Sequence, residues 1–124
     1  MSVVHTVLVV DDDTMVRTLA ARVLVLEGYR VLMAGNGEEA LSIARASVGK
    51  LSLVVTDIRM PEMDGTELAA HLARLTPAPP VLFVSGFTVH GDLPGPFLPK
   101  PFAPRALAEQ VRAILGIPGE QSTL

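Results

Sequence analysis

Apolar and polar positions along the chain follow two alternating patterns. Short aliphatic runs rich in β-branched residues are typical of strands buried on both faces of a sheet. Between these runs, apolar residues recur three and four positions apart, which predicts amphipathic helices. The predicted strands cover residues 3–10, 29–34, 51–56, 81–84 and 97–99, and the predicted helices lie before Gly28, after Asn36, over residues 66–75 and from Pro104 onward.

Residues that commonly cap helices mark where several of these helices begin and end. Asp13 or Thr14 can cap the first helix, and Gly28 supplies its stop. Asn36 is followed three residues later by Glu39, which is the spacing of a capping box. The capping signals therefore agree with the boundaries that the apolar periodicity predicts.

Strand and helix alternate about five times along the chain. This order is typical of a doubly wound α/β fold, in which helices cover both faces of a parallel sheet. In open sheets of this type, ligands bind at the carboxyl ends of the strands. We therefore expect the functional residues directly after the predicted strands.

The connection between the fourth and fifth predicted strands is short for a helical crossover. It reads GFTVHGDLPGP, is rich in glycine and proline, and has no apolar stripe at helical spacing. A crossover between parallel strands needs about a dozen residues or more. We therefore predict that the fourth helix is missing or reduced to one turn.

Composition narrows the class of protein. The 124 residues fit one domain, which we predict over residues 1–117, with 118–124 as a disordered tail. The absence of cysteine excludes disulfides and thiolate chemistry. A formal net charge of −3 gives no basic field for nucleic acid, and no apolar run approaches the roughly 20 residues that span a bilayer. We expect a cytoplasmic protein that binds neither nucleic acid nor membrane.

Three consecutive carboxylates follow the first predicted strand. Asp11, Asp12 and Asp13 end the run VLVVDDD. Like charges about 4 Å apart repel by roughly 4 kcal/mol at the effective dielectric of a protein surface. Asp13 is a candidate helix cap, whereas a divalent cation bound by Asp11 and Asp12 would neutralise the repulsion between them.

The other predicted strands also end in polar residues. The third ends at Asp57, the fourth at Ser85 and the fifth at Lys100. Because parallel strands end at one edge of a sheet, these side chains should lie together. Carboxylates suit Mg²⁺, a carboxylate can attack phosphorus to give an acyl phosphate, and a lysine and a hydroxyl can offset charge on phosphoryl oxygens. The pattern predicts that Asp11 and Asp12 hold Mg²⁺ beside a reacting Asp57.

Four segments together resemble the receiver domain of two-component response regulators, the CheY-like family. They are VLVVDDD, LVVTDIRMPEMDG, PPVLFVSG and FLPKPF, and the resemblance covers residues 7–115. It implies a flavodoxin-like five-stranded sheet in the order 2-1-3-4-5. It also implies that Asp57 is the phosphoacceptor, that Asp12 binds Mg²⁺ directly, and that Asp11 binds it partly through water.

The same resemblance implies roles for residues around the phosphoacceptor. Arg59 would offer its backbone carbonyl to the metal, Ser85 would swing toward the phosphoryl group, and Lys100 would bind that group. The Lys100–Pro101 peptide bond would be cis, which an X-Pro bond permits at modest cost. Phe97 stands at the aromatic switch position, where a ring without a hydroxyl can act only by packing.

The resemblance implies a function in a His-Asp phosphorelay. A sensor histidine kinase or a histidine phosphotransfer protein would donate a phosphoryl group to Asp57, and phosphorylation would switch contacts with a downstream protein. Self-catalysed transfer and self-hydrolysis are the only reactions expected. The chain could be a single-domain regulator or the receiver of a hybrid histidine kinase. A homodimer through the remodelled fourth-helix face is a further expectation.

Two other functions stay open on the sequence. A phosphohydrolase of the haloacid dehalogenase type carries Asp-x-Asp after its first strand, so Asp11 could be a nucleophile with Asp13 as acid and base. Met15 departs from that pattern, which has Thr or Val at this position. A degenerate receiver would only bind partners, and it would need a broken site.

Overall fold

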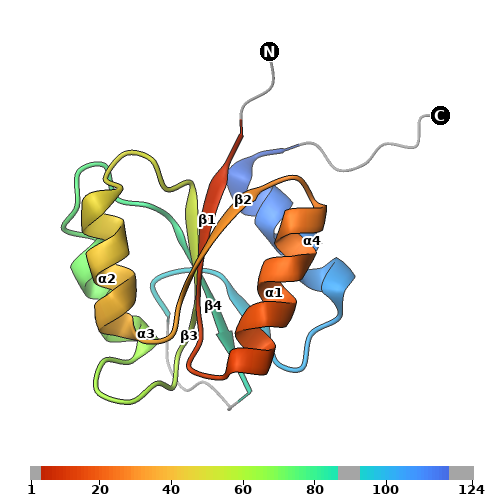
Figure 1. The fold of residues 1–124 in the computed structure, drawn as a ribbon, viewed down its shortest axis with the longest axis horizontal. Coiled ribbons are helices and arrows are strands. Elements are labelled where there is room, and N and C mark those ends of the chain that lie inside the picture. Colours follow the sequence, from red (N-terminus) through yellow and green to blue (C-terminus); the bar gives the residue numbers. More distant parts are fainter. Residues whose placement is uncertain (1–3, 87–92, 118–124) are drawn as a thin grey trace.

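The computed structural model describes residues 4–86 and 93–117 of the chain. Within these residues strands and helices alternate as far as β4. Strand β5 then follows β4 with no described helix between them, and the last helix comes after β5 (Figure 1). The elements are β1 (Thr6–Val10), α1 (Thr14–Leu26), β2 (Arg30–Ala34), α2 (Gly37–Ala46), β3 (Leu53–Asp57), α3 (Gly65–Leu72), β4 (Val81–Ser85), β5 (Phe97–Pro99) and α4 (Pro104–Leu115).

The strands form one parallel sheet in the order β2-β1-β3-β4-β5. This confirms the doubly wound, flavodoxin-like fold. Side chains of β1 alternate between two cores, with Val7 and Val9 in one and Leu8 and Val10 in the other. Helices α1 and α4 cover the first core and α2 and α3 cover the second, one pair on each face of the sheet (Figure 1). Alternation with a period of two, on strands buried on both faces, explains why they are aliphatic throughout.

Side-chain caps fix the starts of the first three helices. The Asp13 carboxylate accepts hydrogen bonds from the amides of Met15 and Val16, so Asp13 rather than Thr14 caps α1. Asn36 caps α2 by accepting from the Glu39 amide. The predicted capping box at α2 is incomplete, because the Glu39 carboxylate accepts from the amide of Gly35 instead of that of Asn36.

Helix α3 differs most from its predicted range of 66–75. It begins at Gly65, one residue after Asp64, which forms a complete capping box with Glu67. It ends at Leu72, three residues earlier than the apolar periodicity indicated. The missed capping box explains the early start, since the carboxylate of Asp64 replaces a hydrogen-bond partner that the first turn lacks.

The fourth helix that was predicted to be missing or reduced is the one between β4 and β5, and not α4. Most of that connection, residues 87–92, lies outside the described residues. In the described part of this connection, Gly86 and residues 93–96 are not helical. The predicted tail, residues 118–124, also lies outside the described residues. Among the helices that the structure does describe, none has the length and apolar content needed to cross a bilayer.

Candidate functional site

Strand alternation brings three charged side chains to one side of the sheet's carboxyl edge. Asp11, Asp57 and Lys100 each stand two positions after a core residue of β1, β3 or β5. Those three core residues all pack in the core beneath α1 and α4, and side chains two positions apart on a strand share a face. The core residues are Val9, Val55 and Leu98.

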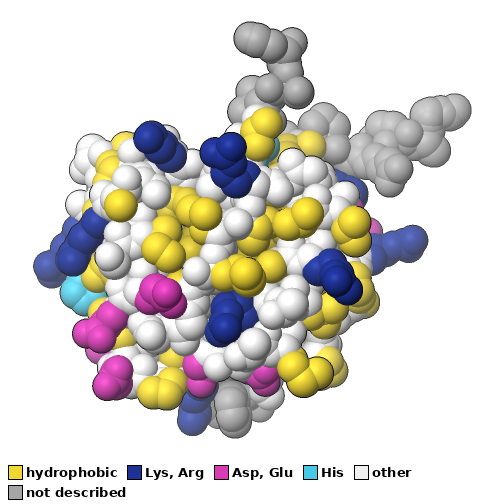
Figure 2. All heavy atoms as spheres, in the orientation of Figure 1, with side chains coloured by type: hydrophobic (Ala, Val, Ile, Leu, Met, Phe, Trp, Pro, Cys, Tyr) yellow, Lys and Arg dark blue, Asp and Glu magenta, His cyan; other side chains and the backbone are white. Residues whose placement is uncertain are grey.

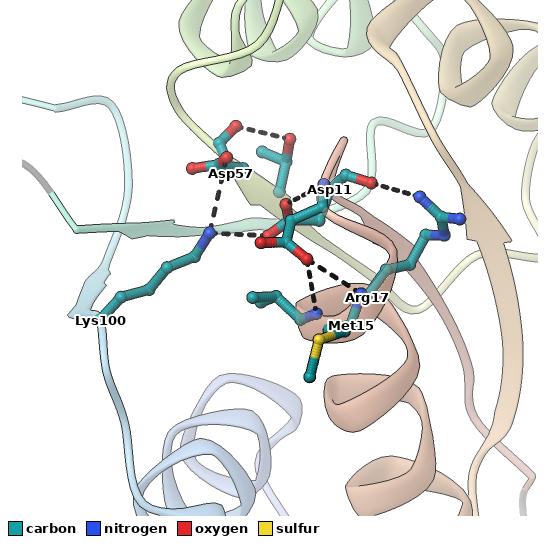
Figure 3. A network of polar contacts seen from close by, with 8 residues as sticks. Asp11, Met15, Arg17, Asp57 and Lys100 are labelled. Atoms are coloured by element: carbon teal, nitrogen blue, oxygen red, sulfur yellow. Dashed lines mark hydrogen bonds and ion pairs between the residues drawn. The ribbon is translucent and has the colours of Figure 1, made fainter.

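Lys100 joins the two buried carboxylates (Figure 3). Its Nζ atom lies 2.8 Å from Asp11 Oδ2 and 3.5 Å from Asp57 Oδ2. The exposed fractions of the side chains are 18% for Lys100, 6% for Asp11 and 9% for Asp57. Burial alone would lower the pKa of Lys100, but its hydrogen bond to Asp11 and the charges of both carboxylates outweigh this and raise that pKa. Lys100 is therefore a fixed positive charge at neutral pH.

Each residue of the Asp11–Asp12–Asp13 run has a different environment. Asp11 is buried, and its side chain accepts a hydrogen bond of 2.9 Å from the Asp13 amide. The Arg17 guanidinium donates to the Asp11 carbonyl at 2.7 Å, so α1 fixes this backbone from a second direction (Figure 3). Asp12 is exposed, and the Asp13 carboxylate is taken up by the cap of α1. Two of the three carboxylates thus remain for a site.

Asp11, Asp12 and Asp57 form an acidic cluster that could hold a metal ion. One carboxylate oxygen from each lies within 4.8 Å of the other two. Desolvation raises the pKa of Asp57, the charge of Asp11 raises it further, and Lys100 partly opposes both effects. Three carboxylates facing one ammonium leave excess negative charge, and an all-oxygen donor set suits a hard divalent cation. The chemistry of the cluster therefore fits a metal site.

The remaining predicted residues border this cluster. Ser85 is buried and directly follows Val84, the residue that pairs with Asp57 in the sheet. Its carbonyl accepts a hydrogen bond of 2.8 Å from the Lys100 amide. Arg59 is exposed, two residues beyond Asp57, and Phe97 is partly buried at the start of β5. The roles of these side chains stay predictions.

The peptide bond between Lys100 and Pro101 is cis, as the family resemblance implies. A second cis bond, which nothing in the sequence predicted, joins Thr76 and Pro77.

Gly65 and Arg17 also border the candidate site, although the sequence pattern did not predict them there. A Cβ atom at Gly65 would lie 2.2 Å from the Asp57 carbonyl oxygen, so only glycine fits at this close approach. The Gly65 amide donates to the Ile58 carbonyl at 2.8 Å, which ties α3 to the end of β3. The Asp64–Gly65 pair at the start of a helix was a sequence signal for Gly65. For Arg17 there was no such signal, because nothing local marks it as the partner of the Asp11 carbonyl, six residues earlier.

A parallel α/β fold with three carboxylates and a lysine at the carboxyl ends of its strands defines a receiver-like class of protein. The family model of the response regulator receiver domain matches residues 7–94, and the chain belongs to this family. Membership does not favour the haloacid dehalogenase alternative. That alternative also needs Asp13 as acid and base, but the Asp13 carboxylate caps α1.

Curated relatives include proteins much longer than this chain. It is 39% identical over 117 residues to the sensor kinase CckA of Brucella abortus, a match that covers 89% of this chain and 12% of that protein. It is 33% identical over 118 residues to the probable transcriptional regulator ycf27 of Porphyra purpurea, covering 88% of this chain and 46% of that protein. The chain thus spans less than half the length of these relatives.

Solved structures match the whole fold. The receiver domain of the hybrid histidine kinase CckA has a TM-score of 0.80 at 40% identity, covering 89% of this chain and 98% of that one. The chemotaxis response regulator CheY4 of Vibrio cholerae has a TM-score of 0.81 at 26% identity, covering 90% of this chain and 99% of that one.

Proposed function

We propose that Asp57 accepts a phosphoryl group from a phosphohistidine. The observation that carries this proposal is the buried Asp57 carboxylate, 3.5 Å from Lys100 and inside a cluster of three carboxylates. An Asp57 oxygen would attack phosphorus, a P–O bond would form, and the P–N bond to the donor histidine would break. The Lys100 ammonium would shift from the carboxylates toward the phosphoryl oxygens. There its positive charge would stabilise the negative charge on those oxygens as the new bond forms.

We propose Mg²⁺ as the cation of the acidic cluster. Asp12 and Asp57 would bind it directly, Asp11 partly through water, and Arg59 through its backbone carbonyl. When bound, Mg²⁺ supplies positive charge to the phosphoryl oxygens. The Ser85 hydroxyl would donate a hydrogen bond to one of those oxygens. Phe97 would change its packing at the start of β5 when Asp57 is phosphorylated.

The donor that we propose is a sensor histidine kinase or a histidine phosphotransfer protein in the cytoplasm. The similarity to the CckA receiver domain supports the place of such a receiver in a hybrid kinase, whereas the similarity to CheY4 supports a response regulator. We place the receiver domain at residues 1–117. A homodimer through the face that contains the β4–β5 connection, where the predicted fourth helix is missing or reduced, stays a prediction. Residues 87–92 of that connection lie outside the described residues.

Mapping the modified residue after treatment with acetyl phosphate and Mg²⁺ tests the proposal. We expect one phosphoryl group, located on Asp57 by mass spectrometry of peptides, and none in Asp57→Asn or in the presence of EDTA. An Asp13→Asn variant is the matched control, since Asp13 lies close in sequence but caps α1, and it should be modified normally. Label on Asp11 that persists in Asp57→Asn would instead support the phosphohydrolase alternative.

The variant Asp57→Asn should also melt at a higher temperature than the parent at neutral pH without metal. Because the folded pKa of Asp57 is raised above its ordinary value of 3.8, protonated Asp57 favours folding. That contribution is complete below pH 3.8 and is lost as the pH rises through the folded pKa, so ionised Asp57 opposes folding at neutral pH. Each kcal/mol that the substitution adds to the free energy of unfolding should raise the melting temperature by about 3–5 °C at this chain length.

Differential scanning fluorimetry with EDTA or millimolar Mg²⁺ checks this second prediction. Mg²⁺ should stabilise the parent by binding the folded state, and should stabilise Asp57→Asn less. Glu109→Gln, which removes an exposed carboxylate on α4, is the control and should follow the parent. A melting curve of the parent that Mg²⁺ leaves unmoved would count against the metal assignment.

A further inference from the structure

Strand β2 lies at an edge of the sheet and has an open outer side. Its first and last residues, Arg30 and Ala34, hydrogen bond through their backbones toward β1. Bonding residues alternate along a parallel strand, so Leu32 also faces β1. The backbone N–H and C=O groups of Val31 and Met33 therefore point away from the sheet. A further strand could pair with them without any change in β2.

The two edges of the sheet differ in how they are protected. Natural edge strands are commonly kept short, or carry proline, a bulge or charges that discourage pairing. The opposite edge, β5, has three residues and ends in Pro99, which has no N–H to donate. In contrast, β2 has five residues in regular register, contains no proline, and carries a charge only at Arg30. Edge pairing is thus discouraged at β5 and not at β2.

Apolar side chains surround the β2 edge. Met33 is 49% exposed, and Val25 of α1 is 56% exposed. Val25 continues the row of Arg17 and Ala21 at a spacing of four residues, and the Arg17 end of this row lies beside Gly35, directly after β2. Figure 2 shows apolar side chains gathered over the middle of this face, where α1, β2 and α2 meet. Covering this region would remove apolar surface from water.

Opposite charges stand at the two ends of the β2 edge. Arg30 is exposed, and by alternation its side chain lies on the same side of the sheet as Leu32 and Ala34, which pack toward α2. Glu39 on α2 is exposed, and its Oε1 atom accepts a hydrogen bond of 2.7 Å from the amide of Gly35, just past the end of β2. The α2 side of the edge therefore begins with a cation and ends with an anion, and the Arg17 guanidinium of α1 also lies beside Gly35.

We propose that a second copy of this chain binds the β2 edge, so that the two β2 strands pair antiparallel about a two-fold axis at Leu32. Val31 of each copy exchanges hydrogen bonds with the partner's Met33, and the two sheets become continuous. Arg30 then lies near the partner's Glu39 at both ends of the contact. Parallel pairing would place like charges together, so the charge pattern selects the antiparallel arrangement. The residues that make this contact lie outside the acidic cluster of Asp11, Asp12 and Asp57.

Charge reversal tests both the surface and the orientation. Such a small contact associates weakly, so sedimentation velocity should be measured up to about 1 mM protein. We expect a monomer–dimer equilibrium in which Arg30→Glu or Glu39→Arg raises the dissociation constant roughly tenfold, and in which the double variant returns toward the parent value. Melting curves show that each variant is folded, since Glu39→Arg also loses the bond to Gly35. A strictly monomeric parent, or single reversals without effect, would overturn the proposal.

A cysteine cross-link gives an independent measurement, because the chain has no cysteine of its own. At the two-fold axis, Leu32 faces the partner's Leu32 in a pair without hydrogen bonds, where Cα atoms lie about 4.5 Å apart, within disulfide reach. Leu32→Cys should therefore form a covalent dimer under mild oxidation much faster than the control Glu109→Cys, which presents an exposed cysteine on α4. Equal rates for the two variants would rule out the antiparallel β2 pairing.

Discussion

Replacing Lys100 with methionine should slow phosphorylation of Asp57 by roughly two to three orders of magnitude, the effect of removing one pre-positioned electrostatic donor. It should also destabilise the fold by about 2–3 kcal/mol. The Lys100 ammonium lies 2.8 Å from Asp11 and 3.5 Å from Asp57, and both carboxylates are almost fully buried. Without it, two like charges face each other with no counterion. The loss falls somewhat below that of a fully buried pair, because Lys100 keeps some contact with water.

Lys50→Met is the matched control for this variant. The chain contains two lysines, and Lys50 is exposed and lies outside the acidic cluster. It should leave both the phosphorylation rate and the urea midpoint close to the parent values. Adding Asp11→Asn to Lys100→Met should recover part of the stability by removing one uncompensated charge, but not the rate. Equal stability of Lys100→Met and Lys50→Met in urea would show that the ion pair contributes nothing.

Much of the site was predictable because it depends on local rules applied at several strand ends. A strand buried on both faces reads as a continuous aliphatic run, so a polar residue directly after it marks the carboxyl edge. Asp57 and Ser85 were found in this way, whereas Lys100 was found at the end of the short edge strand β5. The alternation that puts Asp11, Asp57 and Lys100 on one side of the sheet follows from the same register. The order of the strands, in contrast, came from the family resemblance and not from the residues.

Two kinds of feature escaped prediction: local caps, which apolar periodicity does not report, and contacts between separate elements. Helix α3 was predicted from apolar periodicity, which does not report the capping box of Asp64 and Glu67 or the early end at Leu72. The hydrogen bond from Arg17 to the Asp11 carbonyl needs the packing of α1 against the sheet before it can be seen. Arg30 and Glu39 are nine residues apart in sequence, and only the fold shows that they flank opposite ends of the β2 edge.

The close approach between Gly65 and the Asp57 carbonyl predicts a large effect of adding a side chain at Gly65. Gly65→Ala should destabilise the protein by about 3 kcal/mol or more, which lowers the melting temperature by roughly 10 °C. The added Cβ would lie 2.2 Å from the Asp57 carbonyl oxygen and 3.0 Å from Ile58 Cα. Both are backbone atoms, so no side chain can rotate out of the way. Either the first turn of α3 or the end of β3 must move.

Gly86→Ala provides the control for Gly65→Ala, because it adds the same methyl group directly after another strand of the site. A Cβ atom at Gly86 would meet Lys100 Cβ at 3.7 Å, an ordinary contact, so this variant should stay within about 0.5 kcal/mol of the parent. Thermal unfolding and amide chemical shifts measure the two variants side by side. We expect the shifts of Asp57 and Ile58 to change in Gly65→Ala and to persist in Gly86→Ala. Coincident melting curves would mean that α3 can slide away from β3 at no cost, and Asp57 would then lack the fixed backbone that its proposed reaction requires.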